Sequence, residues 1–231
     1  MNDASIIDGC TDSNLNPPLL DMLDSEEMKI INKSRFSVAF HKGEVILKQG
    51  TKANYFVTLL SGFAKMYIEG HNRLNLILKY VKPRTLVGGP GIHITGKHHY
   101  SVVAVQETLV CFIDLKNFRK ILAVNSDFTN QYLALCSFNY GRILDRMIGL
   151  SQKQMHGRIA DALIYLSEDI YESNKIDHEI SRQDMADYTS MSKDSAIRIL
   201  KEFERDSIIH LDGRTIEILD SKRLYDISQK G

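Results

Sequence analysis

Hydrophobic and polar residues follow two different periods along this chain, and the period changes near Asp114. From Phe36 to about Asp114, short apolar runs are separated by glycines, and residues 63–68 and 74–80 alternate apolar and polar positions. Such alternation places one face of a strand in a core. Residues 55–60 are apolar without alternation, which predicts a strand buried on both faces. Many short strands with tight turns predict a jelly roll or barrel for this region.

A helical period replaces the alternation after Asp114. Apolar residues recur every three or four positions at Leu133, Cys136, Tyr140, Ile143, Met147 and Leu150. A spacing of this kind is typical of the seam between two coiled-coil helices. We therefore expect these six residues to form the interface of a homodimer. Leu135, Phe138 and Leu144 lie outside the seam, and we expect them to pack on the chain's own β domain.

Polar stretches suggest where the chain divides. Residues 1–18 are polar and predict a mobile tail, followed by an amphipathic helix that begins at Leu19. The stretch from Ser151 to Gly157 is polar and ends in glycine, which predicts a hinge. The expected organisation is a tail at 1–18, a β-rich sensor domain at 19–125, a dimerisation helix with its hinge at 126–153 and a C-terminal domain at 154–231.

Residues 180–219 carry the signals of two short helices and a hairpin. Ser181 followed by Asp184 matches a capping box, and Ser192 can cap a second helix after a three-residue turn. In the second helix, the positions expected to face inward are Ala196, Ile199, Leu200 and Phe203. Residues 208–218 alternate around Asp212-Gly213, which favours a hairpin with a type I′ turn. This order predicts a winged helix-turn-helix.

A helix of this kind fits the major groove of B-form DNA, so we expect double-stranded DNA as a partner. Arginine and lysine donate to guanine, and a carboxylate accepts from cytosine. The expected base-reading residues are Lys193, Asp194, Ser195 and Arg198. Arg182 and Lys201 suit phosphates, and Ser181 and Ser192 are further expected contacts at the two helix starts.

Charge argues against this assignment at first sight. The chain has 29 basic and 29 acidic residues, and from Gly157 onward 11 basic residues face 16 acidic ones. A DNA-binding domain is usually basic. The order of caps, helices and hairpin still favours DNA, because only one face needs to be positive. The acidic balance predicts modest non-specific affinity and a marked salt dependence.

This order of modules resembles the Crp-Fnr family of bacterial transcription regulators over nearly the whole chain after the tail. The most specific stretches are FHKGEVILKQGTKANYFVTLLSGFAKMY, HGRIADALIYLS and ISRQDMADYTSMSKDSAIRILKEFE. The resemblance implies an α+β fold with a jelly-roll sensor domain, a long dimerisation helix and a C-terminal winged helix-turn-helix. It also implies a homodimer that reads a palindromic DNA site, an effector at the β-roll and, for an activator, contact with RNA polymerase.

The resemblance places the main base-reading positions on Lys193, Asp194 and Arg198. Lys193 is commonly arginine in the cyclic-AMP members of the family, and lysine lacks the planar fork of arginine. The effector pocket that the resemblance implies consists of Gly88, Gly89, Gly91, Ile92, His99, Tyr100, Ile143 and Leu144.

That pocket departs from the cyclic-AMP members. Gly88-Gly89 stands where they carry a Gly-Glu pair for the ribose, and His99-Tyr100 stands where they carry an Arg-Ser pair for the cyclic phosphate. Ile143 and Leu144 stand where Thr and Ser bond the adenine. A buried phosphate without a charge-assisted donor is strongly disfavoured. We therefore expect an effector other than cyclic AMP, of unknown identity.

The cysteines and histidines decide which other cofactors the sequence permits. An iron–sulfur cluster is excluded, because it needs a group of cysteines and only Cys10 lies near the N-terminus. Haem stays open, with candidate ligands at His71, His93, His98, His99 and Cys111. Adjacent His98 and His99 on a strand would point to opposite faces, which argues against a shared site.

Two alternatives belong to other functional classes. A cupin-type β-barrel metalloenzyme needs an HxH pair with further ligands downstream, and the chain has no HxH. No nucleophile arrangement is recognisable by motif, so we expect no catalytic residue, no metal and no enzyme activity. The second alternative is a ligand-sensing scaffold whose helical part binds a protein rather than DNA. The chain has no apolar run of about 18 residues and no signal-peptide pattern, so we expect a cytoplasmic protein without a membrane partner.

Overall fold

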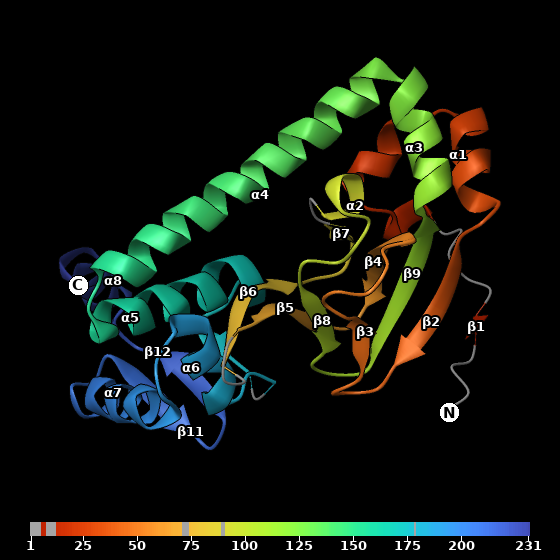
Figure 1. The fold of residues 1–231 in the computed structure, drawn as a ribbon. Helices are drawn as coiled ribbons and strands as arrows, with labels where there is room; N and C mark the ends of the chain where they lie inside the picture. The colour runs from red at the N-terminus through yellow and green to blue at the C-terminus, as the bar shows by residue number, and fades with distance from the viewer. Residues whose placement is uncertain (1–5, 8–12, 71–73, 89–90, 178) are drawn as a thin grey trace. The chain divides into compact units, whose positions relative to one another are not determined.

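The computed structural model describes residues 6–7, 13–70, 74–88, 91–177 and 179–231 (Figure 1). The chain divides into two compact units. Unit 1 consists of residues 1–69 and 79–141, and unit 2 consists of residues 70–78 and 142–231. Three residues named above, Cys10, His71 and Gly89, lie outside the described residues.

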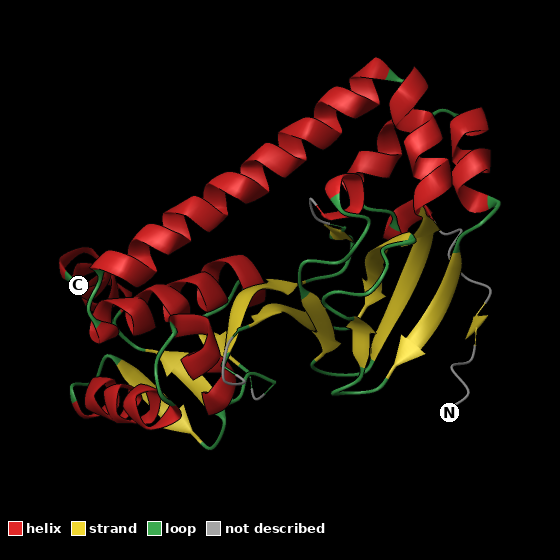
Figure 2. Ribbon diagram, in the orientation of Figure 1, coloured by secondary structure: helices red, strands yellow, loops and turns green. Residues whose placement is uncertain are grey.

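Two antiparallel sheets form the β-roll, as the alternation predicts (Figure 2). One sheet has the strand order β1-β2-β9-β4-β7 and the other has the order β3-β8-β5-β6. Their bounds are β1 Ile6–Ile7, β2 Phe36–Phe40, β3 Val45–Leu47, β4 Tyr55–Ser61, β5 Ala64–Glu69, β6 Asn75–Val81, β7 Leu86–Val87, β8 Ser101–Ala104 and β9 Thr108–Asp114. In β4 the five residues from Phe56 to Leu60 are all buried, which confirms a strand covered on both faces.

Short helices accompany the β-roll. Their bounds are η1 Ser13–Leu15, η2 Pro18–Met22, α1 Ser25–Asn32, α2 Gly91–Ile94 and α3 Leu115–Val124. The prediction of an α-helix from Leu19 is wrong, because residues 18–22 form only a 3₁₀ turn. The α-helix begins at Ser25 instead. There Asp24 and Glu27 form a reciprocal capping box, which satisfies the first unpaired backbone N–H groups.

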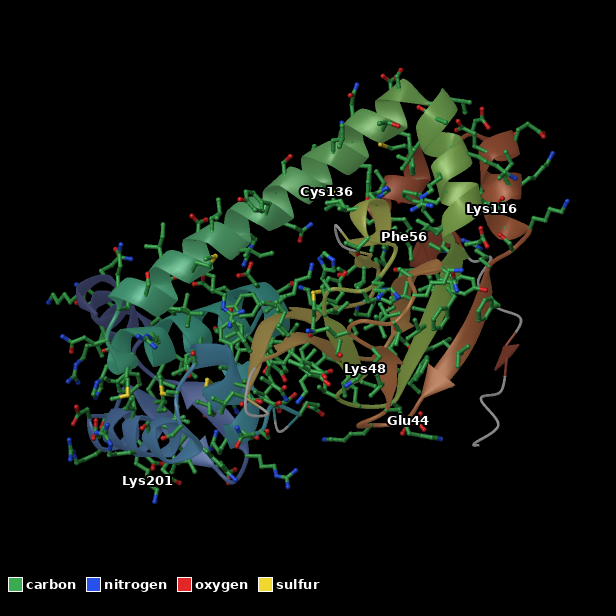
Figure 3. The ribbon with its side chains drawn as sticks, viewed as in Figure 1. Glu44, Lys48, Phe56, Lys116, Cys136 and Lys201 are labelled. Carbon is green, nitrogen blue, oxygen red and sulfur yellow. The ribbon has the colours of Figure 1, made fainter. Side chains whose placement is uncertain are left out.

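Aromatic side chains join the helices to the strands in unit 1. Phe56 of β4, labelled in Figure 3, lies with its ring centroid 4.3 Å from that of Phe118 on α3. Phe118 in turn contacts Phe128 and Tyr132, with centroids 5.3 and 5.4 Å away. All four side chains are buried. Packing of this kind fixes α3 and the start of the long helix α4 (Ser126–Gln152) on the β-roll.

Helix α4 is a single helix of 27 residues. Leu135 packs against the β-roll core as predicted. Phe138 is 63% exposed in the single chain, and Leu144, which belongs to unit 2, is 42% exposed, so their packing on the β domain stays a prediction. Within unit 1, Phe128, Tyr132 and Leu135 join the start of α4 to the core.

Unit 2 contains the C-terminal helices and a three-stranded sheet with the order β10-β12-β11. Its elements after α4 are α5 Met155–Tyr165, the π-helical turn η4 Leu166–Tyr171, β10 Lys175–Ile176, α6 Arg182–Thr189, α7 Lys193–Arg205, β11 Ile209–Asp212, β12 Thr215–Ile218 and α8 Ser221–Lys230. None of the helices within the described ranges is long and apolar enough to cross a membrane.

The break between α4 and α5 is shorter than the predicted hinge. Only Lys153 and Gln154 separate the two helices, and Gly157 lies inside α5. A Cβ atom at Gly157 would come within 2.8 Å of the backbone of Gly231. Gly157 therefore permits close packing of α5 against the end of α8, and it does not act as a turn.

Candidate nucleic-acid interface

Helices α6 and α7 begin at the two caps that the sequence predicts. The Ser181 hydroxyl accepts from the backbone N–H of Asp184 at 3.0 Å, and the Asp184 carboxylate accepts from the Ser181 N–H at 3.0 Å. Ser190 ends α6 in the left-handed conformation with φ 53°. The Ser192 hydroxyl then accepts from the Ser195 N–H at 3.1 Å and starts α7. Serine residues therefore define the tight turn: Ser190 ends the first helix and the Ser192 side chain caps the second.

Helix α7 has one buried and one exposed face. The buried residues are Ala196, Ile199, Leu200 and Phe203, as the spacing predicts. The opposite face exposes Lys193, Asp194, Arg198 and Lys201, the last of which is labelled in Figure 3. Of the other four candidate contacts, Ser181 and Ser192 are exposed, while Arg182 and Ser195 are partly buried. All eight lie on α6, α7 or their caps, so the structure gathers the predicted set on one helix pair.

A shallow groove of about 510 Å³ runs along the exposed face of α7. The residues that line it are Asp194, Ile197, Arg198, Lys201, Glu202 and Arg205. Three of them are cationic and two are anionic. A surface of alternating donors and acceptors suits base edges in a major groove better than it suits phosphates alone.

Arg198 is held by a neighbour on its own helix. Its Nη1 donates to Glu202 Oε1 at 2.7 Å, four residues further along α7. The second oxygen, Oε2, lies 2.7 Å from His156 Nε2 at the start of α5. These contacts keep Glu202 ionised: chiefly the His156 hydrogen bond, and then Arg198, hold the pKa of its carboxyl below the ordinary value.

Sequence reasoning missed Glu202 and His156. The i, i+4 spacing of Arg198 and Glu202 is a known signal for a helical pair and would have found the first of them. His156 lies 46 positions away from Glu202 in the sequence. No local pattern connects them, and only the packing of α5 against α7 brings them together.

Arg182 connects the start of α6 to the hairpin. Its Nη2 donates to the Gly213 carbonyl oxygen at 3.3 Å, and burial lowers the pKa of its guanidinium from the ordinary value. The hairpin confirms the predicted wing, but the predicted turn is wrong. Asp212 pairs with Thr215, so the turn residues are Gly213 and Arg214. Of these two, only Gly213 has a positive φ, at 57°, which matches a type II′ turn rather than type I′.

The described residues of the expected effector pocket have different surroundings. Within unit 1, Gly88, Ile92 and Tyr100 are buried together. A Cβ atom on Gly88 would meet a ring carbon of Phe56 at 2.0 Å and the Ile92 side chain at 2.8 Å. The Tyr100 hydroxyl is hydrogen-bonded by the Gly88 backbone, and burial raises the pKa of that phenol.

The remaining pocket residues lie elsewhere. His99 is exposed, and its Nε2 lies 3.1 Å from the Thr95 hydroxyl. It lines an open surface cleft of about 560 Å³ with Gln49, Gly50, Thr95, Lys97 and His98. Gly91 begins α2, and Ile143 and Leu144 lie on the part of α4 that belongs to unit 2. The effector pocket therefore stays a prediction.

The histidines proposed for haem have separate surroundings. His93 Nε2 lies 2.8 Å from the Tyr132 hydroxyl, and burial lowers the pKa of that imidazole. His98 is buried whereas His99 is exposed, although neither lies on a strand, because β8 begins only at Ser101. In the part of the chain that the structure describes, no three His, Cys, Asp or Glu side chains form a group that could hold a metal ion.

Comparison with protein families gives two matches. The model of the family described as cyclic nucleotide-binding domain matches residues 37–125, and the model described as Crp-like helix-turn-helix domain matches residues 157–227. The first begins in β2 and extends through β9 and α3, and it does not include β1. The second begins within α5, ends within α8 and includes every candidate DNA contact.

Relatives match over most of their length. The transcriptional activator protein Anr of Pseudomonas protegens is 25% identical over 226 residues, which cover 96% of this chain and 89% of that protein. The cAMP-activated global transcriptional regulator CRP of Escherichia coli O6:H1 is 23% identical over 181 residues, 77% of this chain and 86% of that protein. The structure of FixK2 from Bradyrhizobium japonicum has the same fold, with a TM-score of 0.76 at 19% identity over 83% of this chain and 96% of that one.

Proposed function

The chain belongs to the Crp-Fnr family of DNA-binding transcription regulators, and we propose that it acts as a homodimer that reads a two-fold symmetric site through α7. The observation that carries this proposal is the exposed face of α7, with its cations and acceptors above a buried apolar face. The relatives are transcription regulators rather than enzymes, which removes the cupin-type alternative.

The roles proposed for the side chains follow from groove chemistry. Arg198 and Lys193 donate to guanine O6 and N7, and Asp194 accepts from cytosine N4. Lys201 and Arg182 bind phosphates, which set the position of the protein without reading sequence. Ser181, Ser192 and Ser195 lie at the starts of α6 and α7, where hydroxyls and backbone N–H groups suit phosphate oxygens.

Helix α4 supports the proposed dimer. Leu133, Tyr140, Ile143 and Met147 of the predicted seam are 43–63% exposed, Cys136 is exposed and Leu150 is partly buried. Phe138, Leu144 and Ile148 add further exposed apolar area along the same helix. So much apolar surface on one helix favours association with a second copy. Two α7 helices related by a two-fold axis would then reach half-sites roughly 34 Å apart.

Control of the dimer is proposed to lie at the β-roll. Gly88 is packed against Phe56 and Ile92, and its backbone hydrogen-bonds Tyr100, at positions where the resemblance places ligand contacts. This supports an effector other than cyclic AMP, of unknown identity, and haem stays open. We further propose that the protein acts in the cytoplasm and, if it activates transcription, that it contacts RNA polymerase.

Selection of duplexes from a random pool tests DNA reading by α7. The wild-type protein is expected to enrich one motif, and the R198A and K193A variants are expected to bind it roughly 5- to 150-fold more weakly, the range given by 1–3 kcal/mol per base contact. K116A, which removes an exposed cation from α3 of unit 1, serves as the control and is expected to bind normally. Unchanged binding by R198A and K193A at several salt concentrations would instead support the protein-binding scaffold.

Sedimentation of α4 variants tests the dimer separately. A carboxylate introduced at the seam by I143D or M147D would have to be desolvated in the interface, so both variants are expected to be monomers. L219D places the same group on an apolar side chain that is 56% exposed outside α4, and it is expected to remain a dimer. A wild-type monomer at micromolar concentration contradicts the proposal.

A further inference from the structure

We propose that Glu202 is a specificity-determining positioning residue that orients the Arg198 guanidinium for base reading, with His156 holding Glu202 in place. This inference rests on the proposed function, in which Arg198 reads a base. It gives Glu202 and His156 a role in base recognition, although neither residue is proposed to contact a base.

The two oxygens of the Glu202 carboxylate serve two different partners. Oε1 accepts from Arg198 Nη1 at 2.7 Å, and Oε2 accepts from His156 Nε2 at 2.7 Å. An ionised carboxylate only accepts, so the imidazole must present its Nε2–H to it. The Glu202 carboxylate is therefore held by two hydrogen bonds, one from Arg198 on its own helix and one from His156 on α5.

Burial shows which member of the group faces solvent. Both residues line the groove on α7, but the Glu202 side chain is 26% exposed whereas that of Arg198 is 53% exposed. The carboxylate thus lies behind the guanidinium, closer to the protein. Arg198 uses one N–H on Glu202, and the remaining donors of its five can still meet guanine O6 and N7.

Positioning matters because a free arginine side chain has many rotamers. Docking an unrestrained side chain on a base costs conformational entropy, and a side chain that is already bonded in place loses less. The Glu202 bond also offsets part of the Arg198 charge. That weakens sequence-independent attraction to phosphates while leaving directional hydrogen bonds intact. Both effects increase the ratio of specific to non-specific affinity.

His156 makes this arrangement depend on the packing of two helices. Its ring centroid lies 6.0 Å from that of Phe203, the buried residue that follows Glu202. His156 is the second residue of α5, directly after the break at Lys153 and Gln154. A carboxylate anchored outside α7 cannot follow every rotamer of Arg198, and it therefore restrains the guanidinium in one place.

The opposite role would give the opposite result. If Glu202 only occupied Arg198 and kept it from DNA, removal of the carboxylate would release the arginine and tighten specific binding. The two roles are separated by binding to the selected duplex and to a second duplex that differs at one base pair. That base pair is the one expected to contact Arg198, where replacement by alanine is expected to weaken discrimination most.

The experiment measures dissociation constants for both duplexes by fluorescence anisotropy with the full chain at fixed salt. E202A is expected to lose about fivefold or more of the discrimination between the duplexes, while binding to a random duplex stays equal or becomes tighter. H156F keeps a ring next to Phe203 but no donor, and it is expected to lose part of the discrimination. E202Q keeps an acceptor for Arg198 without the charge and is expected to fall between E202A and the wild type.

Two controls separate positioning from folding and from net charge. D226N makes the same charge change on an exposed carboxylate of α8 and is expected to leave discrimination unchanged. In the R198A/E202A double variant, loss of Glu202 is expected to add nothing to R198A, since Glu202 acts only through the arginine. Thermal midpoints of all variants show that the domain is folded.

Three results would overturn the proposal. One is tighter and equally selective binding by E202A, and another is a further loss of discrimination in the double variant beyond R198A. A third is normal discrimination by R198A itself, which would also remove the base-reading role in the proposed function. In the first two cases that role survives and only the role of Glu202 fails.

Discussion

The guanidinium of Arg146 lies over the ring of Tyr188, 3.8 Å from the ring centroid, and its Nη2 donates to the Tyr188 carbonyl oxygen at 2.5 Å. Nη1 donates to the Leu78 carbonyl oxygen. Tyr188 also stacks on Tyr165 of α5, with centroids 5.2 Å apart. Within unit 2, one arginine of α4 thus contacts both the first helix of the helix-turn-helix and Leu78 of β6.

Loss of Arg146 should therefore destabilise unit 2. A desolvated cation–π contact and hydrogen bonds from a charged donor together predict a loss of about 2–4 kcal/mol for R146A. R146K keeps the charge but not the planar fork, so an intermediate loss is expected. Urea unfolding of both variants measures this, and equal stability of R146K and the wild type would show that the fork is not needed.

Gly88 should not tolerate a side chain. A Cβ atom there would come within 2.0 Å of the Phe56 ring, and such overpacking costs about 1–3 kcal/mol. G149A is the matched control, since its Cβ would sit 3.5 Å from Asp161 Oδ2 and a helical alanine is favoured over glycine by about 1 kcal/mol. Thermal unfolding should give a lower Tm for G88A and an equal or higher Tm for G149A. A stable G88A would mean that this segment can move away from Phe56.

Lys201 should contribute to affinity without contributing to sequence preference. If it neutralises one phosphate, K201A weakens binding to all duplexes alike and lowers the slope of log K against log salt by about 1. K116A, on α3, should leave the slope unchanged. A change in the selected motif with K201A would instead make Lys201 a base reader.

His98 should make the β-roll sensitive to acid. Burial lowers the pKa of its imidazole, and its Nδ1 has no hydrogen-bond partner among the described residues. Below its ordinary pKa, the unfolded chain binds a proton that folded His98 resists, so stability falls as the pH falls. H98L is expected to show a smaller drop in Tm between about pH 7.5 and about 5.5. A drop equal to that of the wild type would contradict this.

His41 is expected to change the pH dependence of stability in the opposite direction. Its hydrogen bond to Glu107, 2.9 Å long, raises the pKa of the imidazole. The protonated folded form is therefore favoured at acid pH, and that contribution is lost as the pH rises through the raised pKa. H41Q should lose more Tm on acidification than the wild type does.

Local chemistry made the helix-turn-helix predictable. Ser181, Asp184 and Ser192 fix the helix starts by hydrogen bonds that span only three residues, and the inward positions of α7 follow directly from helical spacing. The β-roll was predictable for the same reason, because its strands alternate or are apolar throughout. The wrong predictions concern sites where the local sequence permits more than one structure. The α-helix begins after Asp24 rather than at Leu19, and the hairpin turn begins after Asp212 rather than at it.

Contacts between distant segments were not predictable. Arg146 with Tyr188, His156 with Glu202 and Gly88 with Phe56 are each separated by more than thirty residues, and no spacing rule connects them. The same limit applies to the pocket. Nothing local indicates that Tyr100 is buried while His99 faces solvent, since both lie in a bend before β8 whose orientation depends on the surrounding packing.

Hydroxyl-radical footprinting of the selected duplex tests most directly that the protein reads DNA as a symmetric dimer. We predict protection in two segments related by a two-fold axis, with centres about one helical turn or roughly 34 Å apart, and two chains bound per duplex. A single unsymmetrical footprint with one chain per duplex would contradict this account.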